Sequence, residues 1–450
     1  MSISLGSEGN FFALSEDISC EAVLRLGKAA ADALCGKKRG SLQIGGRILL
    51  GTDTRRSSRA YEAALTAGIM SAGTDVTSLG VIPQPAGIFL VKKLRADGFI
   101  MIGDSDKGSE YGGFVIYGSD GRRISEDLIE KINEKLSTYS EKTENFGSMS
   151  VSADGISEYI EHILRNCGTE LLGMTVAADC ANGAVSAAAE KLFSSLGAKV
   201  YLLNCDPDGN NINKDCGISH METLAEFVRN KKCDLGLAFD GFGAKCLAVD
   251  EKGITADGEK LLAVFAKDMR ERGVLANNSA VISASANLGF SVFAAENKIK
   301  AVVTKAGGKY ITEKMLAGGF SLGGEQSGSI IFGDICPESD GLLSAVKLLS
   351  AVKRSGKTLG QLCSVMERYP QVAINVKISD KWREVWKNIP ELEALIEKKE
   401  NELGDFGRII VRENPAEPVI RVSVEGRRFD AVNSMALEIA EAVKRLCPVH

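Results

Sequence analysis

The side chains best suited to chemistry lie in turns that follow apolar runs. The segment IGDSDKGSEYGG, Ile102 to Gly113, connects the apolar runs Phe99 to Ile102 and Phe114 to Tyr117 and carries Ser105 at its tip. A serine hydroxyl in such a turn can accept a phosphoryl group. Glycine and aspartate also form plain exposed turns, so an ordinary loop serine is the competing interpretation.

A second turn offers a ligand for a hard cation. The segment FDGFGAKC, Phe239 to Cys246, carries Asp240, whose carboxylate could bind Mg²⁺. Octahedral Mg²⁺ requires more oxygens than one carboxylate supplies, and Phe242 and Ala244 have no side-chain oxygen. From the residues alone, a plain β-turn is the simpler interpretation.

A third turn combines a carboxylate with a hydroxyl. In LGGEQSGSII, Leu322 to Ile331, glycines flank Glu325 and Ser327. These groups suit hydrogen bonds to the neighbouring hydroxyls of a sugar. A structural turn is the alternative.

A fourth turn is framed by two arginines. In RENPAEPVIR, Arg412 and Arg421 stand on either side of a predicted hairpin turn. Guanidinium groups bind phosphate in a bidentate manner. Two unrelated surface arginines are the alternative.

A fifth turn precedes a predicted helix. The segment GTDTRRS, Gly51 to Ser57, follows an apolar strand, and the amide groups at a helix N-terminus favour anions. Capping by Ser57 or Ser58 would explain part of this pattern without a ligand.

The elements that position these turns follow βαβ order, which predicts an α/β protein with mostly parallel sheets. In the clearest unit, Thr175 to Ala178 is a strand, Ala184 to Leu196 a helix and Lys199 to Leu203 the next strand. Similar units recur before Pro370. We therefore expect three similar mixed-sheet α/β domains, residues 1–150, 151–255 and 256–370.

The last segment, residues 371–450, has a different order and predicts a smaller α+β domain. Its strands are expected at Ala373 to Ile378, Arg408 to Arg412 and Val419 to Glu425, and its helices at Lys381 to Leu403 and Ser434 to Leu446.

Composition excludes several classes of function. A net charge of -5 gives no support for nucleic-acid binding. The sequence lacks an apolar run long enough to cross a membrane and begins without an export signal, so we expect a cytoplasmic protein. Eleven cysteines without a C-x-x-C pair are expected to be small buried residues, and three histidines are too few for a histidine cluster.

Taken in order, the five turns resemble the phosphohexomutases, most closely the bacterial phosphoglucosamine mutases. Three segments argue for that subgroup: VAADCANGA at Val176 to Ala184, PDGNNINKDCGISH at Pro207 to His220, and GGEQSG at Gly323 to Gly328, which lies within the third turn. The resemblance covers essentially the whole chain. It implies three α/β domains and a C-terminal domain around a central cleft.

The resemblance also implies a mechanism. A phosphoserine, matched here by Ser105, would give its phosphoryl group to a hexose phosphate and take back the other phosphate, with Mg²⁺ offsetting charge. Asp240 would be a metal ligand together with the phosphate on Ser105. Lys245 stands where the family has an arginine that contacts the phosphoserine. Glu325 and Ser327 would bind the sugar, and Arg412 and Arg421 its phosphate.

Several positions depart from the family pattern. The family sequence Ala-Ser-His-Asn-Pro is replaced by DSDKG, so Asp104 and Asp106 place negative charge beside Ser105, and we expect Lys107 to offset part of it. Phe242 and Ala244 replace two metal-binding aspartates. We therefore expect weak Mg²⁺ binding at best.

Other substitutions fall on the remaining turns. In the phosphate loop, Pro415 and Ala416 replace a glycine and a threonine, which removes two hydrogen-bond donors. Ser329 replaces a histidine, GGK at Gly307 to Lys309 replaces Gly-Asp-Arg, and Phe11 replaces an arginine.

Two hypotheses follow. The first is a pseudoenzyme or strongly impaired mutase that binds a hexose or hexosamine phosphate, or pairs with an active mutase. The second is an active phosphoglucosamine mutase with an unusual metal site, in which Asp106, Glu110 or Asp250 replaces the missing ligands. Homodimerisation is implied only by the family resemblance.

Overall fold

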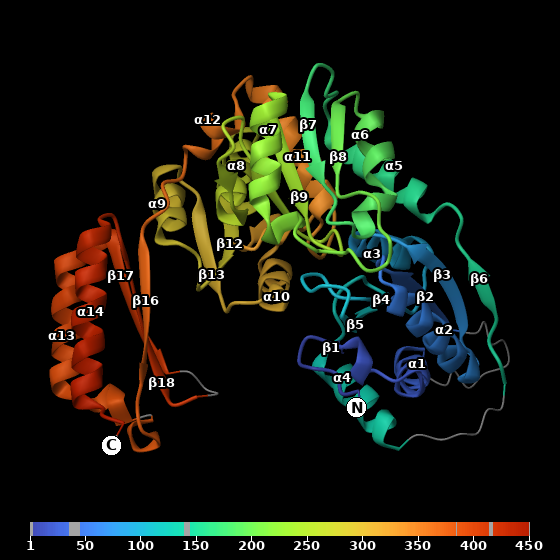
Figure 1. Cartoon of the computed structure of the whole chain (residues 1–450), viewed down its shortest axis with the longest axis horizontal. Coiled ribbons are helices and arrows are strands. Elements are labelled where there is room, and N and C mark those ends of the chain that lie inside the picture. The colour runs from blue at the N-terminus through green and yellow to red at the C-terminus, as the bar shows by residue number, and fades with distance from the viewer. Residues whose placement is uncertain (1–2, 36–45, 139–144, 384, 414–416, 450) are drawn as a thin grey trace. The chain divides into compact units, whose positions relative to one another are not determined.

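A computed structural model describes residues 3–35, 46–138, 145–383, 385–413 and 417–449. The chain divides into two units, one made of residues 1–284 and 302–364 and the other of residues 285–301 and 365–450. Each unit is described by itself (Figure 1).

The first sheet has six strands. Their order is β1 (Asn10–Leu14), β5 (Tyr111–Gly118), β4 (Gly98–Ile102), β2 (Arg47–Thr52), β3 (Asp75–Val81) and β6 (Met149–Val151). Its helices are α1 (Cys20–Leu34), α2 (Arg56–Ser71), α3 (Gln84–Lys93) and α4 (Glu126–Ser137). Helices α1 and α2 can pack closely because Gly68 has no side chain. A Cβ at this position would lie only 2.0 Å from the Leu24 carbonyl oxygen.

The second sheet has the order β11 (Thr255–Ala256), β10 (Cys246–Val249), β9 (Leu235–Phe239), β7 (Thr175–Asp179) and β8 (Lys199–Leu203). Its helices are α5 (Gly155–Cys167), α6 (Ala189–Ser195) and α7 (Met221–Lys231). The helix predicted from Ala184 is instead a 3-10 turn, Ala184–Ala187, followed by α6. The amide of Ala184 donates to the Gly241 carbonyl at 2.9 Å, which ties this turn to the loop after β9.

The third sheet has the order β13 (Lys300–Thr304), β12 (Ser279–Ser283), β14 (Leu322–Gly324) and β15 (Ile330–Phe332). Helices α8 (Gly258–Glu271), α10 (Gly308–Gly318), α11 (Gly341–Ser355) and α12 (Leu359–Cys363) belong to the same stretch of chain.

The three sheets repeat one arrangement. The first sheet contains the order β5-β4-β2-β3, the second β10-β9-β7-β8 and the third β15-β14-β12-β13. In each case two parallel inner strands are extended by an antiparallel hairpin: β4 with β5, β9 with β10, and β14 with β15. The turns that carry Ser105, Asp240 and Glu325 are therefore equivalent hairpin loops of three equivalent sheets.

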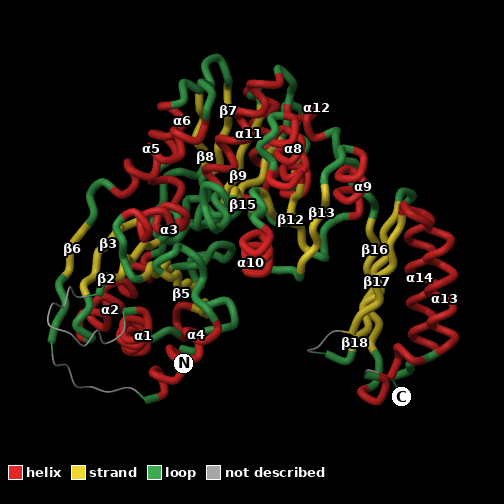
Figure 2. The backbone as a smooth tube through the Cα atoms, turned by 180° about the vertical axis from the view of Figure 1, so that it is seen from behind, coloured by secondary structure: helices red, strands yellow, loops and turns green. Residues whose placement is uncertain are grey.

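The second unit contains an antiparallel sheet with the order β16 (Gln371–Lys377), β18 (Val419–Gly426) and β17 (Gly407–Glu413). Helices α13 (Pro390–Leu403) and α14 (Phe429–Leu446) lie side by side on one face of this sheet (Figures 1 and 2). The helix α9 (Leu288–Glu296) belongs to this unit, and the amide of Leu288 donates to Glu425 Oε1 at 2.9 Å.

The three C-terminal strands match their predicted positions to within two residues, but both helix starts were wrong. The helix predicted from Lys381 begins at Pro390, after two 3-10 turns, because proline favours the first helical turn and lacks the amide needed further inside. The helix predicted from Ser434 begins at Phe429.

The α/β class with three mixed sheets and a smaller C-terminal α+β part is confirmed. Eight of the eleven cysteines are buried, as expected, and Cys20, Cys35 and Cys205 are not. Within the described ranges, no helix is both long and apolar enough to span a bilayer. The central cleft and the three boundaries between the four domains stay predictions.

Candidate active site

Three hairpin loops of the first unit meet through backbone contacts. We call them the Ser105 loop (103–110), the Asp240 loop (240–245) and the Glu325 loop (325–329). The Gly241 amide donates to the Ser105 carbonyl at 2.8 Å. The Cys246 amide donates to the Gly328 carbonyl at 3.1 Å, and Lys245 forms a β-bridge with Ser329. The structure thus brings together Ser105, Asp240, Lys245 and the Glu325 loop.

Ser105 is held by its backbone while its hydroxyl is left unbonded. Besides the Gly241 amide, the Asn213 side chain donates to the Ser105 carbonyl at 3.1 Å and to the Lys107 carbonyl at 2.9 Å. Among the described residues, no group hydrogen-bonds the half-buried Ser105 hydroxyl. A fixed backbone with an available hydroxyl is suitable for carrying a phosphoryl group.

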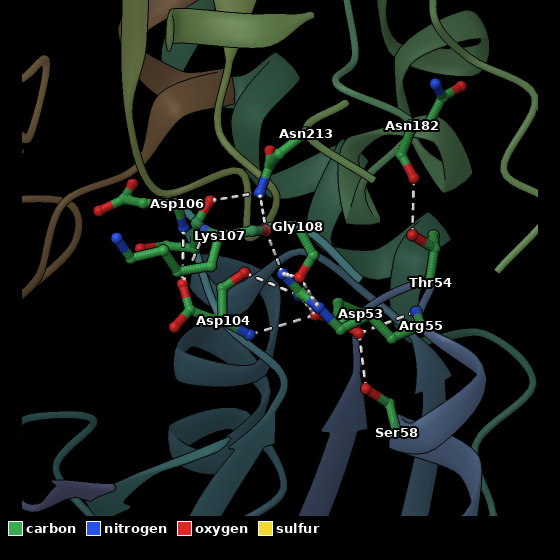
Figure 3. Close-up of polar contacts among 11 residues, drawn as sticks. Asp53, Thr54, Arg55, Ser58, Asp104, Asp106, Lys107, Gly108, Asn182 and Asn213 are labelled. Carbon is green, nitrogen blue, oxygen red and sulfur yellow. Dashed lines mark hydrogen bonds and ion pairs between the residues drawn. The ribbon is translucent and has the colours of Figure 1, made fainter. Parts of the chain in front are cut away.

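Arg55 fastens the Ser105 loop from the first sheet (Figure 3). Its buried guanidinium forms an ion pair with the buried carboxylate of Asp53. It also donates to the Asp104 carbonyl at 2.8 Å and to the Gly108 carbonyl at 3.0 Å, and it bonds the Lys107 carbonyl. Sequence reasoning treated this segment as a possible anion site and missed its role as a clamp.

The capping expected in the same segment was wrong. Helix α2 begins at Arg56, its N-cap is Arg55, and no side chain caps it. Ser58 instead donates to Asp53 Oδ1 at 2.6 Å, and the buried Ser57 hydroxyl has no partner among the described residues.

The charges around Ser105 are arranged differently from the prediction. The Asp104 carboxylate accepts from the Asp106 and Lys107 amides at 2.8 and 3.0 Å, so it closes the loop. Asp106 is paired with Lys245, whose Nζ lies 2.6 and 2.8 Å from its carboxylate oxygens. The Lys107 ammonium lies 5.7 Å from the Tyr111 ring centroid. Lys245, rather than Lys107, therefore neutralises the loop's aspartate.

Asp240 is buried close to the ion pair of Lys245 and Asp106. Its Oδ1 accepts from the Lys245 amide at 2.8 Å, while its Oδ2 has no hydrogen-bond partner in the described part of the chain. Burial raises the pKa of the Asp240 carboxyl to about 6, although Lys245 acts to lower it. Burial also acts to lower the pKa of Lys245, but Asp240 and Asp106 outweigh it and raise that pKa, so Lys245 remains charged.

The oxygens expected of a magnesium site do not converge here. In the described ranges, no group of three His, Cys, Asp or Glu side chains could hold a metal ion. Asp106 is taken by Lys245, and Asp250 Oδ1 accepts from the Lys252 and Ile254 amides at the far end of β10. Glu110 is exposed and joins no such group. Octahedral Mg²⁺ takes six oxygens, and of these carboxylates only that of Asp240 has a buried oxygen without a hydrogen-bond partner among the described residues, so the residues do not fit this ion.

The predicted sugar-binding residues differ in their availability. Glu325 Oε1 accepts from the Gly307 amide at 3.0 Å, so one oxygen is already bonded. Ser327 is exposed and has no hydrogen bond among the described residues. Lys309, in the substituted GGK segment, pairs with Glu126 at 2.8 Å, and the half-buried Phe11 packs against the core of the first sheet.

Arg412 and Arg421 belong to the second unit. They are exposed and directly opposite each other on β17 and β18, as the predicted hairpin requires. Two like charges facing each other are unfavourable without an anion between them. The predicted losses at Pro415 and Ala416 lie outside the described residues.

Comparison with known proteins agrees with the folded arrangement. Sequence models of phosphoglucomutase/phosphomannomutase α/β/α domains I, II and III match residues 8–143, 157–253 and 257–369, and the C-terminal domain matches residues 374–442. The chain belongs to the phosphoglucomutase/phosphomannomutase family.

Relatives in this family include phosphoglucosamine mutases. That of Clostridium acetobutylicum is 38% identical, over 98% of this chain and 98% of its own length. That of Clostridium perfringens is also 38% identical, over 99% and 100%.

Solved structures of the family share the fold. A phosphoglucomutase/phosphomannomutase family protein of Burkholderia thailandensis has a TM-score of 0.80 at 20% identity, covering 98% of this chain and 96% of its own. The Aspergillus fumigatus N-acetylphosphoglucosamine mutase, solved with GlcNAc-6P and magnesium, has a TM-score of 0.67 at 14% identity, covering 99% and 96%. The predicted family and its fold are therefore confirmed.

Proposed function

We propose that this protein interconverts glucosamine 6-phosphate and glucosamine 1-phosphate through a phosphoserine at Ser105. One observation carries the proposal: the backbone of the Ser105 loop is fastened to the Asp240 loop and to Asn213, while the hydroxyl remains unbonded. The full-length similarity to phosphoglucosamine mutases supports the choice of sugar.

Ser105 is phosphorylated beforehand by a sugar 1,6-bisphosphate, which leaves as a sugar monophosphate. The reaction then has two transfers. In the first, O1 of glucosamine 6-phosphate attacks the phosphoryl group on Ser105, so the Oγ–P bond breaks, the O1–P bond forms and the O1 proton passes to Oγ. In the second, Ser105 Oγ takes the 6-phosphoryl group from the bisphosphate, so the O6–P bond breaks, the Oγ–P bond forms again and the Oγ proton passes to O6.

The chain's own residues account for several roles. Arg55 and Asn213 hold the loop, Lys245 places a positive charge beside it, and Ser327 offers an exposed hydroxyl to the sugar. We assign Arg412 and Arg421 to the non-reacting phosphate on their chemistry. A cytoplasmic location, a homodimer and the boundaries 150, 255 and 370 remain part of the proposal.

A second candidate is a protein that binds hexosamine phosphate without turning it over. Phe242 and Ala244 favour it, because both are buried apolar residues where the family has metal-binding carboxylates. Such a protein would act as a binding module or as the partner of an active mutase.

A coupled assay separates the two candidates. Glucosamine 1-phosphate formation is measured with a bisphosphate activator, for the native protein and Ser105→Ala, alongside calorimetry with glucosamine 6-phosphate. Turnover that disappears in Ser105→Ala supports the mutase. Binding without turnover supports the second candidate, and the absence of both contradicts each.

A further inference from the structure

Lys245 occupies the position from which a cation would act on the Ser105 loop. It belongs to the Asp240 loop, and its side chain is 17% exposed. Its Nζ donates hydrogen bonds to the carboxylate of Asp106, the residue after Ser105. We propose that this site works without a divalent metal, with the Lys245 ammonium as its built-in cation. The catalytic part of this inference rests on the proposed function, whereas the absence of metal binding does not.

The Asp240 loop is shaped by protein contacts that need no ion. The Gly243 amide donates to the Asp240 carbonyl at 3.0 Å, and the Phe242 carbonyl accepts from the Gln84 amide at 2.9 Å. The Gly243 carbonyl accepts from the Gly341 amide at 3.0 Å. A loop closed by these bonds keeps its conformation without a metal to gather its side chains.

The two missing carboxylates are replaced by apolar packing. The Phe242 and Ala244 residues are only 2% and 6% exposed. A divalent ion beside Asp240 would meet these apolar side chains and a nearby ammonium of like charge. Removing water from Mg²⁺ without supplying oxygens is unfavourable.

An ammonium fits the charge that is present. Asp240 is buried, one of its oxygens has no hydrogen-bond partner among the described residues, and Asp106 adds a second carboxylate. A fixed positive charge at this edge can stabilise negative charge on a phosphoryl group carried by Ser105. Arg55 cannot take this role because its donors are used on Asp53 and on the loop carbonyls.

Metal binding is tested directly with Mn²⁺ as the probe, by electron paramagnetic resonance on the full-length protein. We expect no bound Mn²⁺ at up to 1 mM for the native protein. Phe242→Asp/Ala244→Asp is expected to gain a site if it folds. Stoichiometric Mn²⁺ binding to the native protein that is lost in Asp240→Asn would overturn the inference, whether or not the double variant folds.

The role of Lys245 is tested by phosphorylation of Ser105 from glucose 1,6-bisphosphate in excess EDTA. We expect EDTA to change the native rate by less than twofold, Lys245→Met to lower it at least tenfold, and Lys245→Arg to retain most of it. Lys231→Met, an exposed lysine on α7, is the matched control and should match the native protein.

The failures of the two proposals are distinguishable. Phosphorylation that occurs only with added Mg²⁺, or that is unchanged in Lys245→Met, overturns the role of Lys245. No phosphorylation under any condition contradicts the proposed function, and the Mn²⁺ measurement then decides on metal binding alone.

Discussion

Replacing Arg55 tests how the Ser105 loop is held in place. The side chains of Arg55 and Asp53 are both fully buried and form an ion pair. The same guanidinium bonds the carbonyls of Asp104, Lys107 and Gly108. Arg55→Ala removes these bonds and leaves a buried carboxylate without its cation.

The expected loss is large. Removing one partner of a buried ion pair costs about 3–5 kcal/mol, because the remaining charge is uncompensated. We expect Arg55→Ala to lower the free energy of unfolding by about this amount in urea denaturation. Arg59→Ala, on the exposed side of the same helix, should change it by about 0.5 kcal/mol or less.

Two further measurements separate the effect of the unpaired Asp53 carboxylate from the effect of losing the hydrogen bonds between Arg55 and the Ser105 loop. Asp53→Asn/Arg55→Ala should recover part of the lost stability, because the unpaired charge is gone. Trypsin should cleave after the exposed Lys107 faster in Arg55→Ala than in Arg59→Ala, because the loop carbonyls are released. A stability loss below about 1 kcal/mol, together with equal cleavage rates, would refute the clamp.

Three other predictions concern the same unit. Asn213→Ala removes two hydrogen bonds to the Ser105 loop and should destabilise the protein by about 1–3 kcal/mol in urea. Gly258→Ala should lower the melting temperature by several degrees, because its Cβ would lie 2.1 Å from a carbonyl of the Glu325 loop; Gly308→Ala, with nothing within 4 Å, is the control. Burial raises the pKa of Glu338 from 4.5 to about 7 although Arg123 opposes this, so the fold favours the protonated form and loses stability as pH rises through about 7. The native protein should therefore lose up to about 3 kcal/mol relative to Glu338→Gln between pH 4.5 and 8, and parallel pH profiles would contradict this.

The strands could be predicted because each has a short apolar run bounded by turn residues. Lys199–Leu203 and Val419–Gly426 lie where the pattern placed them, apart from one residue. Helix ends were harder because they depend on local backbone contacts. The start of the helix at Ala184 is changed by its bond to Gly241, which is distant in sequence and becomes a neighbour only after folding.

The candidate residues could be selected from the sequence, but the contacts that hold them could not. Ser105, Asp240 and Glu325 could be found because each follows an apolar strand. Arg55 and Asn213 could not be linked to Ser105, since Asn213 lies 108 residues away along the chain. The assignment of Lys107 as the compensating cation failed for the same reason: proximity in sequence did not reveal that Lys245 reaches Asp106.

Close backbone contacts hold the loops of the candidate site in position. A Cβ at Gly183 would lie 2.6 Å from the Gly241 carbonyl oxygen, and one at Gly241 would lie 3.1 Å from the Ser105 carbonyl oxygen. These backbones approach one another so closely that only glycine fits at both positions without a shift. The loop positions are thus fixed by backbone packing rather than by ligands gathered around an ion. The Lys245 ammonium, on the hairpin of Asp240, pairs with Asp106 and adds a positive charge to this arrangement.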